Sequence, residues 1–329
     1  MKLLAGIDIG GTKCAVSLGV LIGDGTIQIV SKTRFHTPST PEEAIEQLLN
    51  ALDKELENRP GEELAAIGIS CGGPLDSRRG LVLSPPNLKG WNAVDIVSPF
   101  TRRYGVPSAL QNDANACALA EWKWGAGKGS SNMIFLTFGT GMGAGLILNG
   151  ALYSGTNDMA GEVGHIRLEK DGPTGYGKAG SFEGFCSGGG IAQLGKRIVS
   201  KRLADGHPPE FCTTAEELPL LTAEIVGRAA EQGDPVAIEI YRVSAMQLGR
   251  ALALLIDVLN PERIVIGSIY GRQKAIMEPI VMEELRREAL PRSSAVCEIL
   301  QAGLGEQIGD YASLSVALNH LLEKGEIQV

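Results

Sequence analysis

Runs of apolar residues separated by glycine-containing turns dominate the first third of the chain. They predict a series of short buried strands, at 3–9, 15–22, 26–35 and 65–70 and closing at 109–111. Between the third and fourth strands, apolar residues recur at helical spacing and predict an amphipathic helix over 42–56. Another helix is expected to follow Asn112 and to end near Trp124.

The combination of strand, glycine turn and strand occurs a second time. Residues 10–13 connect the first two predicted strands, and residues 139–143 connect two further strands expected at 133–138 and 144–148. Few residues are identical, but the two hairpins share one pattern. This partial repeat indicates a duplicated architecture in which one glycine turn from each half faces a shared cleft.

Helical periodicity dominates the last third of the chain. Asp234-Pro235 is a typical helix start, and Asn260-Pro261 is a typical stop. The elements expected after that stop are a strand, a helix, a strand and a helix, at 263–267, 274–290, 296–301 and 309–323. Because strands alternate with helices, we expect an α/β fold.

Length and charge limit the class of protein. The chain has 329 residues, which suggests roughly two domains, and a net charge of −8. An acidic chain without a run of Lys and Arg is a poor match for nucleic acid or for a membrane surface. Residues 129–157 carry no charged side chain, but their repeated glycines favour strands and a turn over a membrane span.

Cysteine usage and the start of the chain indicate a cytoplasmic protein. The six cysteines form no CxxC pair and mostly lie in apolar surroundings, as expected for free thiols in a reducing compartment. The first residues contain no adequate apolar signal region before Asp8 interrupts them.

Glycine turns next to an acidic residue are the first candidate chemistry. Nineteen of the 43 glycines lie within 125–190, where tight turns or a backbone-lined site would need them. The amides of a glycine turn can bind phosphate, and Asp8, just before the first turn, could hold Mg²⁺ through water. Two ordinary hairpins with a solvated Asp8 are the alternative.

Two further segments carry candidate catalytic groups. Asn112 and Asp113 lie where a strand meets a helix. A carboxylate there is well placed as a general base, although helix capping is the more frequent use. Glu162 and His165 lie three residues apart between glycines and could bind a polyol or a metal, although a lone His is more often structural.

Three other features are weak on their own. Residues 175–180 form a GxGxxG segment, but no strand precedes it, so we expect no dinucleotide site there. Asn87, after two prolines, indicates only a turn residue, and Glu183 indicates only a surface acid.

Together these features resemble the ROK family of sugar kinases, in the superfamily that includes Hsp70 and actin. The segments that carry the resemblance span the chain: 6–13, 112–115, 138–145 and 161–165. The family implies a two-domain, actin-like ATPase (ribonuclease H-like) fold with the active-site cleft between the domains. A smaller domain would cover 1–115, with the last helix, about 309–329, packing back on it, and a larger domain would cover 116–308.

The resemblance implies a homodimeric enzyme that uses ATP and Mg²⁺ to phosphorylate a glucose-like hexose, at O6. Asp113 would be the general base, in a sugar-binding set of Gly72, Gly73, Asn87, Asn112, Asp113, Glu162, His165 and Glu183. The nucleotide would lie against Asp8, Gly10, Gly11, Thr12, Lys13, Thr137, Gly139, Thr140, Gly141, Gly267 and Ser268, with Asp8 near the metal. Adenosine is expected beside Gly267, Ser268 and a turn at 303–305, where the usual glycine triplet of the family is missing.

One loop also departs from the family pattern. Many members hold zinc with the His of a Gly-His pair and three cysteines, and here the cysteine positions hold Thr174, Tyr176 and Ser181. Neutral hydroxyl groups cannot replace three thiolates around Zn²⁺. The sequence therefore predicts no structural zinc, and we expect packing of Tyr176, Phe182 and Phe185 to shape the loop instead.

Two other functions are compatible with the same family. One is a sugar-responsive transcription repressor, but a first strand at residue 3 is expected to leave no room for the N-terminal DNA-binding domain of such members. The other is a sugar-binding protein without catalytic activity, which the presence of Asp8, Asp113 and both glycine turns disfavours.

Overall fold

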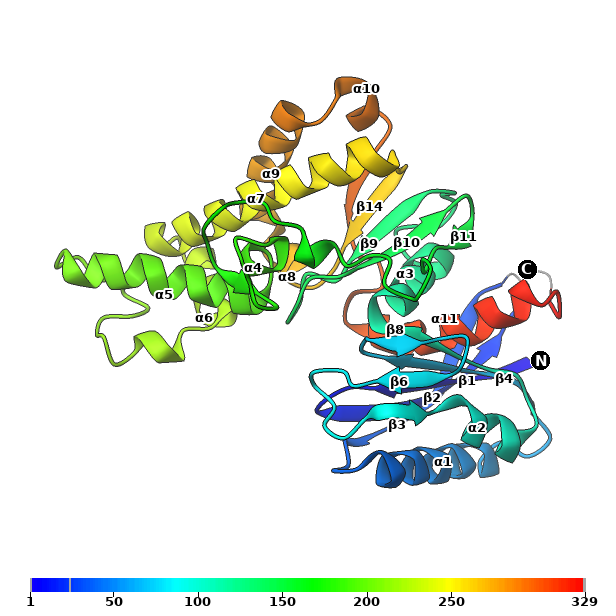
Figure 1. Ribbon diagram of the computed structural model, residues 1–329. Helices are drawn as coiled ribbons and strands as arrows, with labels where there is room; N and C mark the ends of the chain where they lie inside the picture. Colours follow the sequence, from blue (N-terminus) through cyan, green and yellow to red (C-terminus); the bar gives the residue numbers. More distant parts are fainter. Residues whose placement is uncertain (1, 24, 328–329) are drawn as a thin grey trace.

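Two five-stranded sheets form the framework of the protein in the computed structural model, which describes residues 2–23 and 25–327 (Figure 1). The first sheet has the order β3-β2-β1-β4-β8, with β1 at Lys2–Ile9, β2 at Lys13–Leu21, β3 at Ile27–His36, β4 at Glu63–Cys71 and β8 at Ser108–Asn112. Helices α1 (Pro41–Glu57) and α2 (Val97–Tyr104) contribute apolar side chains, such as the buried Leu48 and Phe100, to the core of this sheet.

The second sheet repeats the first strand for strand. Its order is β11-β10-β9-β14-β15, with β9 at Met133–Leu136, β10 at Ala144–Leu148, β11 at Ala151–Leu152, β14 at Arg263–Ile266 and β15 at Glu298–Gln301. In both sheets the first three strands along the chain are antiparallel neighbours, and the last two run parallel to the central strand. The duplicated architecture predicted from the two glycine turns is confirmed.

Four longer helices share one core with the second sheet. They are α5 (Gly188–Ala204), α6 (Ala223–Glu231), α7 (Pro235–Leu259) and α9 (Lys274–Glu288). In Figure 1, α5 and α6 extend to the left, away from both sheets. Asp234 starts α7 as predicted, because its carboxylate accepts hydrogen bonds from the amides of Val236 and Ala237.

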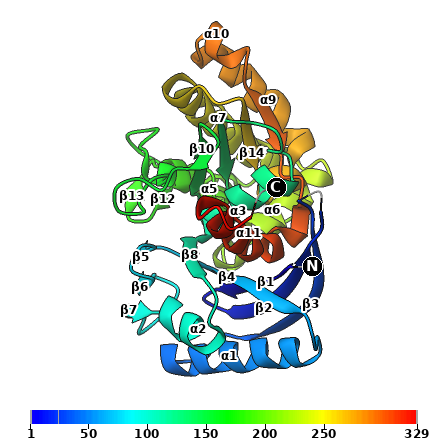
Figure 2. The ribbon, with the colours of Figure 1, turned by 90° about the vertical axis from the view of Figure 1, so that its right-hand side faces the viewer.

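Helices α3 (Asp113–Trp124) and α11 (Ile308–Glu323) lie between the two sheets (Figure 2). Helix α11 packs on β1 and β4, whereas α3 packs on β9 and β10. Glycines permit this close approach: a Cβ at Gly68 in β4 would lie 2.0 Å from the carbonyl oxygen of Ser313 in α11. A Cβ at Gly145 in β10 would likewise lie 2.4 Å from the carbonyl oxygen of Ala114 in α3. The predicted domain limits, near residue 115 and at the last helix, stay a prediction.

The remaining elements are short, and most were not predicted. They are β5 (Leu75–Asp76), β6 (Leu81–Leu83), β7 (Asn92–Asp95), β12 (Thr174–Gly175), β13 (Lys178–Ala179), α4 (Phe182–Phe185), α8 (Ile269–Arg272) and α10 (Pro291–Ser294), with 3₁₀ turns at Val163–His165, Leu218–Leu220 and Gly305–Gln307. The expected strand at 133–138 ends earlier, at Leu136, because Phe138 adopts a positive φ of 20° and turns the chain. Helix α5 escaped prediction because it begins with three glycines, which disfavour a helix; Ser187 caps it by accepting a hydrogen bond from the Gly190 amide.

The six cysteines are all free, as predicted. Across the described residues, none of the helices has the length and apolar character needed to cross a membrane.

The contact between β4 and α11 predicts a specific sensitivity. In Gly68→Ala the new methyl group would meet helix backbone, which cannot move aside as a side chain can, so we expect the free energy of unfolding to fall by about 1–3 kcal/mol. Gly309→Ala, in α11 itself, is the matched control: no atom lies within 4 Å of its Cβ position, and alanine favours a helix. Urea unfolding of both variants checks this, and a Gly68→Ala protein as stable as the unsubstituted one would contradict the packing.

Candidate active site

The carboxyl ends of three parallel strands meet at one edge of the first sheet. Ile9 of β1 pairs with Cys71 of β4, and Cys71 pairs with Asn112 of β8. This register places Asp8, the Gly72-Gly73 pair and Asp113 along the same edge, which is where open α/β sheets bind ligands. A Cβ at either glycine would meet no atom within 4 Å, so open space lies beside them.

Asp8 and Asp113 are electrostatically coupled at this edge. Burial, together with repulsion from Asp113 and Asp310, raises the pKa of Asp8 to about 7, against the opposing effects of Lys32 and Arg34. Burial also raises the pKa of Asp113, although hydrogen bonds from the backbone oppose this effect. Solvent reaches the Asp113 side chain, yet protein atoms surround it closely enough to desolvate its charge. The edge therefore favours binding of a cation or of a proton.

Asn112 and Asp113 divide two tasks between them. Asn112 is the N-cap of α3, and its side-chain oxygen accepts a hydrogen bond of 2.7 Å from the Asn115 amide. The capping alternative considered for this pair thus holds for Asn112. Asp113 is the first residue of the helix, where the positive end of the helix dipole lies.

Acidic residues of the second half approach Asp113. Burial raises the pKa of Glu162, repulsion from Asp113 and Glu183 raises it further, and the nearby His165 lowers it. These effects show that the fold brings together Asp113, Glu162, His165 and Glu183, which lie in three separate segments of the sequence. Glu183 also accepts a hydrogen bond of 3.1 Å from the Met142 amide, so it supports the second glycine turn as well.

The first glycine turn is held from both sides. The Gly10 amide donates to the Lys13 carbonyl at 3.0 Å, and the Thr37 hydroxyl donates to the Gly10 carbonyl at 2.6 Å. Asn87 packs against the turn, because a Cβ at Gly11 would lie 2.6 Å from the Asn87 carbonyl oxygen. Thr12 and Lys13 are exposed and can reach a bound anion.

The second glycine turn has its own supports. The Gly143 amide donates to the Thr137 hydroxyl at 2.9 Å, and the Gly139 amide donates to the Gly141 carbonyl at 3.0 Å. A Cβ at Gly141 would lie 2.8 Å from a carboxylate oxygen of Glu183, so a side chain there would displace that acid. Thr140, at the tip, is exposed.

A cavity of about 290 Å³ opens at the carboxyl ends of β9, β14 and β15, the edge of the second sheet that corresponds to the Asp113 edge of the first. Thr137, Gly267, Ser268, Ala302 and Gly305 are among the residues that line it. The structure thus brings together the segments in which the sequence predicted adenosine contacts. Ser268 takes a positive φ of 53°, a conformation that favours glycine.

Glu121 is a buried support of this cavity that the sequence reasoning missed. Its side chain is 0% exposed, and its carboxylate accepts hydrogen bonds of 2.8–3.0 Å from the amides of Ala126, Gly303 and Leu304. It thereby fixes the turn at 303–305. No local pattern signals this role, because its partners Gly303 and Leu304 lie far away in the sequence.

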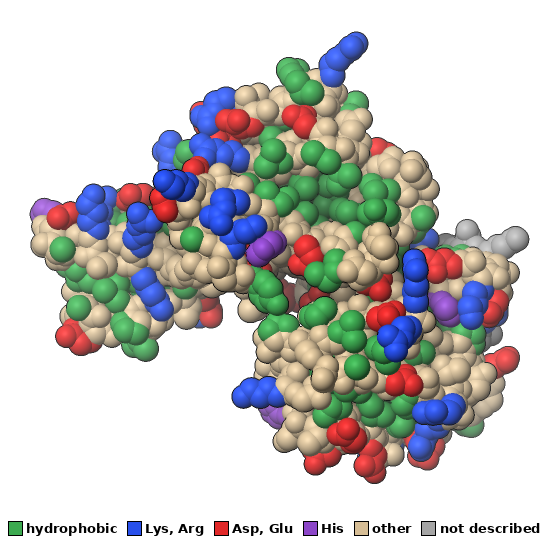
Figure 3. All heavy atoms as spheres, in the orientation of Figure 1, with side chains coloured by type: hydrophobic (Ala, Val, Ile, Leu, Met, Phe, Trp, Pro, Cys, Tyr) green, Lys and Arg blue, Asp and Glu red, His purple; other side chains and the backbone are tan. Residues whose placement is uncertain are grey.

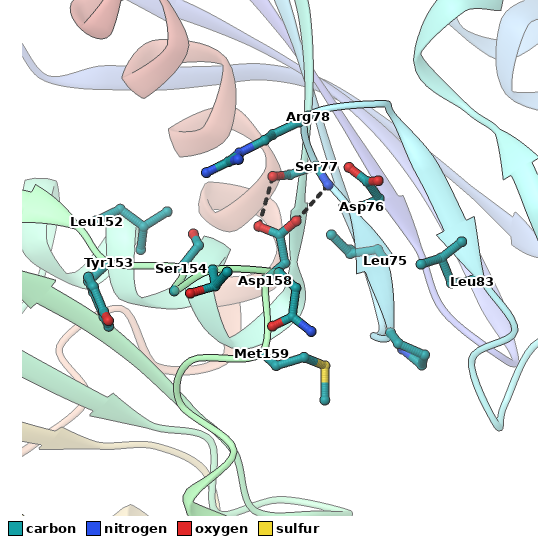
Figure 4. A pocket seen from close by; sticks show the side chains of 14 residues that line it. Leu75, Asp76, Ser77, Arg78, Leu83, Leu152, Tyr153, Ser154, Asp158 and Met159 are labelled. Carbon is teal, nitrogen blue, oxygen red and sulfur yellow. Dashed lines mark hydrogen bonds between the residues drawn. The ribbon is translucent and has the colours of Figure 1, made fainter.

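A wider cavity of about 600 Å³ lies between the two halves. Its lining on the first half begins at Pro74, directly after Gly72 and Gly73, and residues 152–159 line it on the second half. Figure 3 shows the hollow between the halves, and Figure 4 shows the side chains that line this cavity. Ser77 of the first half donates from its amide and its hydroxyl to the Asp158 carboxylate of the second half, at 2.8 Å each. These two bonds join the halves at the cavity wall.

The loop without cysteines is held by ordinary hydrogen bonds. Gln193 of α5 accepts from the Thr174 amide and donates to the Thr174 carbonyl, both at 2.9 Å. Ser181 caps α4, and Phe182 and Phe185 are buried as predicted. The expectation for Tyr176 is wrong: it is 76% exposed, because it lies at the tip of the β12–β13 hairpin with a φ of 42°.

No group of three or more His, Cys, Asp or Glu side chains suited to a metal occurs among the residues that the structure describes. The predicted absence of structural zinc stays a prediction.

The comparisons with known proteins agree with this geometry. The model of the ROK family matches residues 4–317. The glucokinase of Streptomyces coelicolor is 32% identical over 94% of this chain and 95% of its own. A ROK family glucokinase from Streptomyces griseus, solved in complex with glucose and AMPPNP, superposes with a TM-score of 0.74 at 29% identity, covering 96% of this chain and 99% of that one. The Escherichia coli transcriptional dual regulator NagC is 26% identical, over 93% of this chain and 78% of its own.

These matches define a protein with the actin-like ATPase fold whose two halves enclose a candidate active site. The chain belongs to the ROK family. The predicted fold and the predicted class of enzyme, a sugar kinase, are confirmed at this level.

The raised pKa of Asp8 predicts a pH-dependent cost to stability. With a pKa of about 7 in the folded protein, against 3.8 as its ordinary value, Asp8 keeps a proton that the unfolded chain has lost. The free energy of unfolding therefore falls as the pH rises from about 4 to 7. Asp8→Asn removes this cost, so we expect it to stabilise the ligand-free protein by about 1–3 kcal/mol at pH 8 and by less near pH 5.

Urea unfolding at the two pH values measures the effect. Asp171→Asn, at an exposed position, is the control and should give no such pH-dependent gain. Equal effects of Asp8→Asn at both pH values would contradict the coupling.

Proposed function

We propose that this protein transfers the terminal phosphoryl group of ATP to a hydroxyl of a glucose-like hexose, O6, with Asp113 as the general base. The observation that carries this proposal is the position of Asp113. It lies at the start of α3, coupled to Asp8 on the phosphate side and to Glu162 on the sugar side.

The electrostatics of Asp113 suit a base. A general base works best when its pKa lies near the operating pH, and burial raises the pKa of Asp113 in that direction. Phosphoryl transfer passes through a loose transition state, so positioning and charge stabilisation supply most of the catalysis. Asp113 would accept the hydroxyl proton while the rigid start of α3 holds its carboxylate in place.

The phosphate side fits a nucleotide with Mg²⁺. Both glycine turns can offer backbone amides to phosphate, with the exposed Thr12, Lys13 and Thr140 beside them. A Cβ at Gly11 or Gly141 would clash with Asn87 or Glu183, so glycine keeps each turn packed on its support. Asp8 offers the carboxylate oxygens that Mg²⁺ prefers. Bound Mg²⁺·ATP would supply the phosphoryl group and neutralise its charge, and the 290 Å³ cavity would hold adenosine.

The sugar side is rich in hydrogen-bonding groups. Glu162, His165 and Glu183 approach Asp113, Asn112 directly precedes it, and Asn87 packs against Gly11 of the first glycine turn. Carboxylates and imidazoles can bind the hydroxyls of a hexose. The AMPPNP and glucose present in the Streptomyces griseus relative support the same division into a nucleotide side and a sugar side.

A sugar-responsive regulator is the second candidate, favoured by the similarity to NagC. A regulator of this kind, an inactive sugar-binding protein and a kinase would all bind sugar. The first two would consume no ATP, so a measurement of product separates them from the kinase.

A panel of hexoses with ATP and Mg²⁺ tests the proposal. We expect one glucose-like hexose to yield a sugar phosphate and ADP in equal amounts, with the phosphate on O6 by nuclear magnetic resonance. In Asp113→Asn, kcat should fall by about 100-fold or more while the sugar still binds, because only the proton acceptor is lost. ATP consumption by coupled assay and sugar binding by calorimetry give the two readouts.

The outcomes are distinct. A kcat for Asp113→Asn close to that of the unsubstituted enzyme would overturn the assignment of the base. Sugar binding without any sugar phosphate, across the whole panel, would overturn the kinase and leave a sugar-binding function.

A further inference from the structure

The mouth of the 290 Å³ cavity holds one positive and one negative side chain. Among the residues that line it, Arg272 at the end of α8 and Glu306 are the charged ones. The remaining lining groups are neutral, and the chain as a whole carries a net charge of −8. A nucleotide that entered this cavity would therefore meet a single cation there.

Arg272 lies close to the second glycine turn. Its Nη2 donates to the Ser268 hydroxyl at 3.0 Å. That hydroxyl oxygen in turn lies 3.6 Å from the position that a Cβ at Gly139 would occupy. The guanidinium is thus held, through one side chain, at the edge of the turn that the proposed function assigns to phosphate. Ser268 supplies this link from a strained backbone conformation, with a φ of 53°.

The pair between Arg272 and Glu306 is weak enough to be exchanged. Nη1 of Arg272 lies 3.3 Å from a Glu306 carboxylate oxygen, and the two side chains are 55% and 93% exposed. Solvated ion pairs of this kind contribute little to stability. The planar guanidinium matches phosphate oxygens at least as well as a carboxylate, and it can bind two of them at once.

We propose that Arg272 is a phosphate-binding residue of the nucleotide site, which exchanges Glu306 for a phosphate oxygen of the nucleotide while Ser268 keeps the guanidinium in place. This inference rests on the proposed function. It implies that Glu306 competes with the nucleotide and that the contribution of Arg272 depends on how many phosphates the nucleotide carries.

Binding of adenosine, AMP and ADP to the full-length protein tests the inference by calorimetry at fixed Mg²⁺. In Arg272→Ala we expect ADP to bind about 10-fold or more weakly, because a charge-assisted hydrogen bond is lost, while adenosine changes by about 2-fold or less. Arg272→Lys should recover part of the ADP affinity, because lysine keeps the positive charge but lacks the planar guanidinium that can bind two phosphate oxygens at once. Glu306→Gln should bind ADP as tightly as the unsubstituted protein or more tightly, since the competing carboxylate is gone.

Arg228→Ala is the matched control, because Arg228 is another exposed arginine paired with a glutamate, Glu224, and lines neither cavity. It should leave all three affinities unchanged. An equal loss for adenosine and ADP in Arg272→Ala would overturn the phosphate assignment in favour of a contact to the base or a folding defect. Unchanged ADP affinity would overturn the inference and leave the proposed function intact. Failure of the unsubstituted protein to bind any of the three would overturn both.

Discussion

Asp8 and Asp113 are held within Coulombic reach of each other at one edge of the first sheet, where burial raises the pKa of both. Because burial and mutual repulsion disfavour their charged forms, these two acids destabilise the ligand-free protein. The other groups of the candidate site are arranged around them. The first glycine turn begins two residues after Asp8, and Glu162 and Glu183 approach Asp113 from the other half. A site of this charge gains most from a ligand that brings a divalent cation on one side and a hydroxyl proton on the other.

The duplicated sheet explains why the two sides of the site can specialise. The strand ends occupy equivalent positions, Ile9–Cys71–Asn112 in one half and Leu136–Ile266–Gln301 in the other. The first set leads into Gly72 and Gly73, which have open space beside them, and the second opens onto the 290 Å³ cavity. In the first half these ends carry the acids, whereas the lining of the 290 Å³ cavity is neutral apart from Arg272 and Glu306. Many of the glycines crowded into 125–190 serve this assembly by close packing: a Cβ at Gly161 or Gly164 would lie 2.0 or 2.1 Å from backbone oxygens of Ala144 and Met142, in and beside the second turn.

The sequence allowed most strands of the two large sheets, both glycine turns and the duplicated pattern to be predicted, because each depends on local periodicity or on a turn that needs glycine. The candidate sugar and phosphate residues were implied by the resemblance to the ROK family, and the fold brings Asp113, Glu162, His165 and Glu183 together. Glu121 and Arg272 were missed because their roles depend on contacts with residues 182 and 34 positions away in the chain, Gly303 and Glu306, which no local pattern reveals. Tyr176 was misplaced for a related reason: an aromatic residue suggests packing, but the β12–β13 hairpin turns it outward, and Gln193 orders the loop instead.

The coupling between these acids and a bound ligand can be measured as the number of protons that the protein releases on binding. At pH 7 a carboxyl group with a pKa of about 7 is half protonated, so binding of Mg²⁺·ADP beside Asp8 should release about half a proton per site. Calorimetric titrations in two buffers of different ionisation enthalpy report that number directly. The account predicts a release of this size in the unsubstituted protein and its loss in Asp8→Asn. Binding heats that are independent of the buffer, or an equal release in Asp8→Asn, would contradict it.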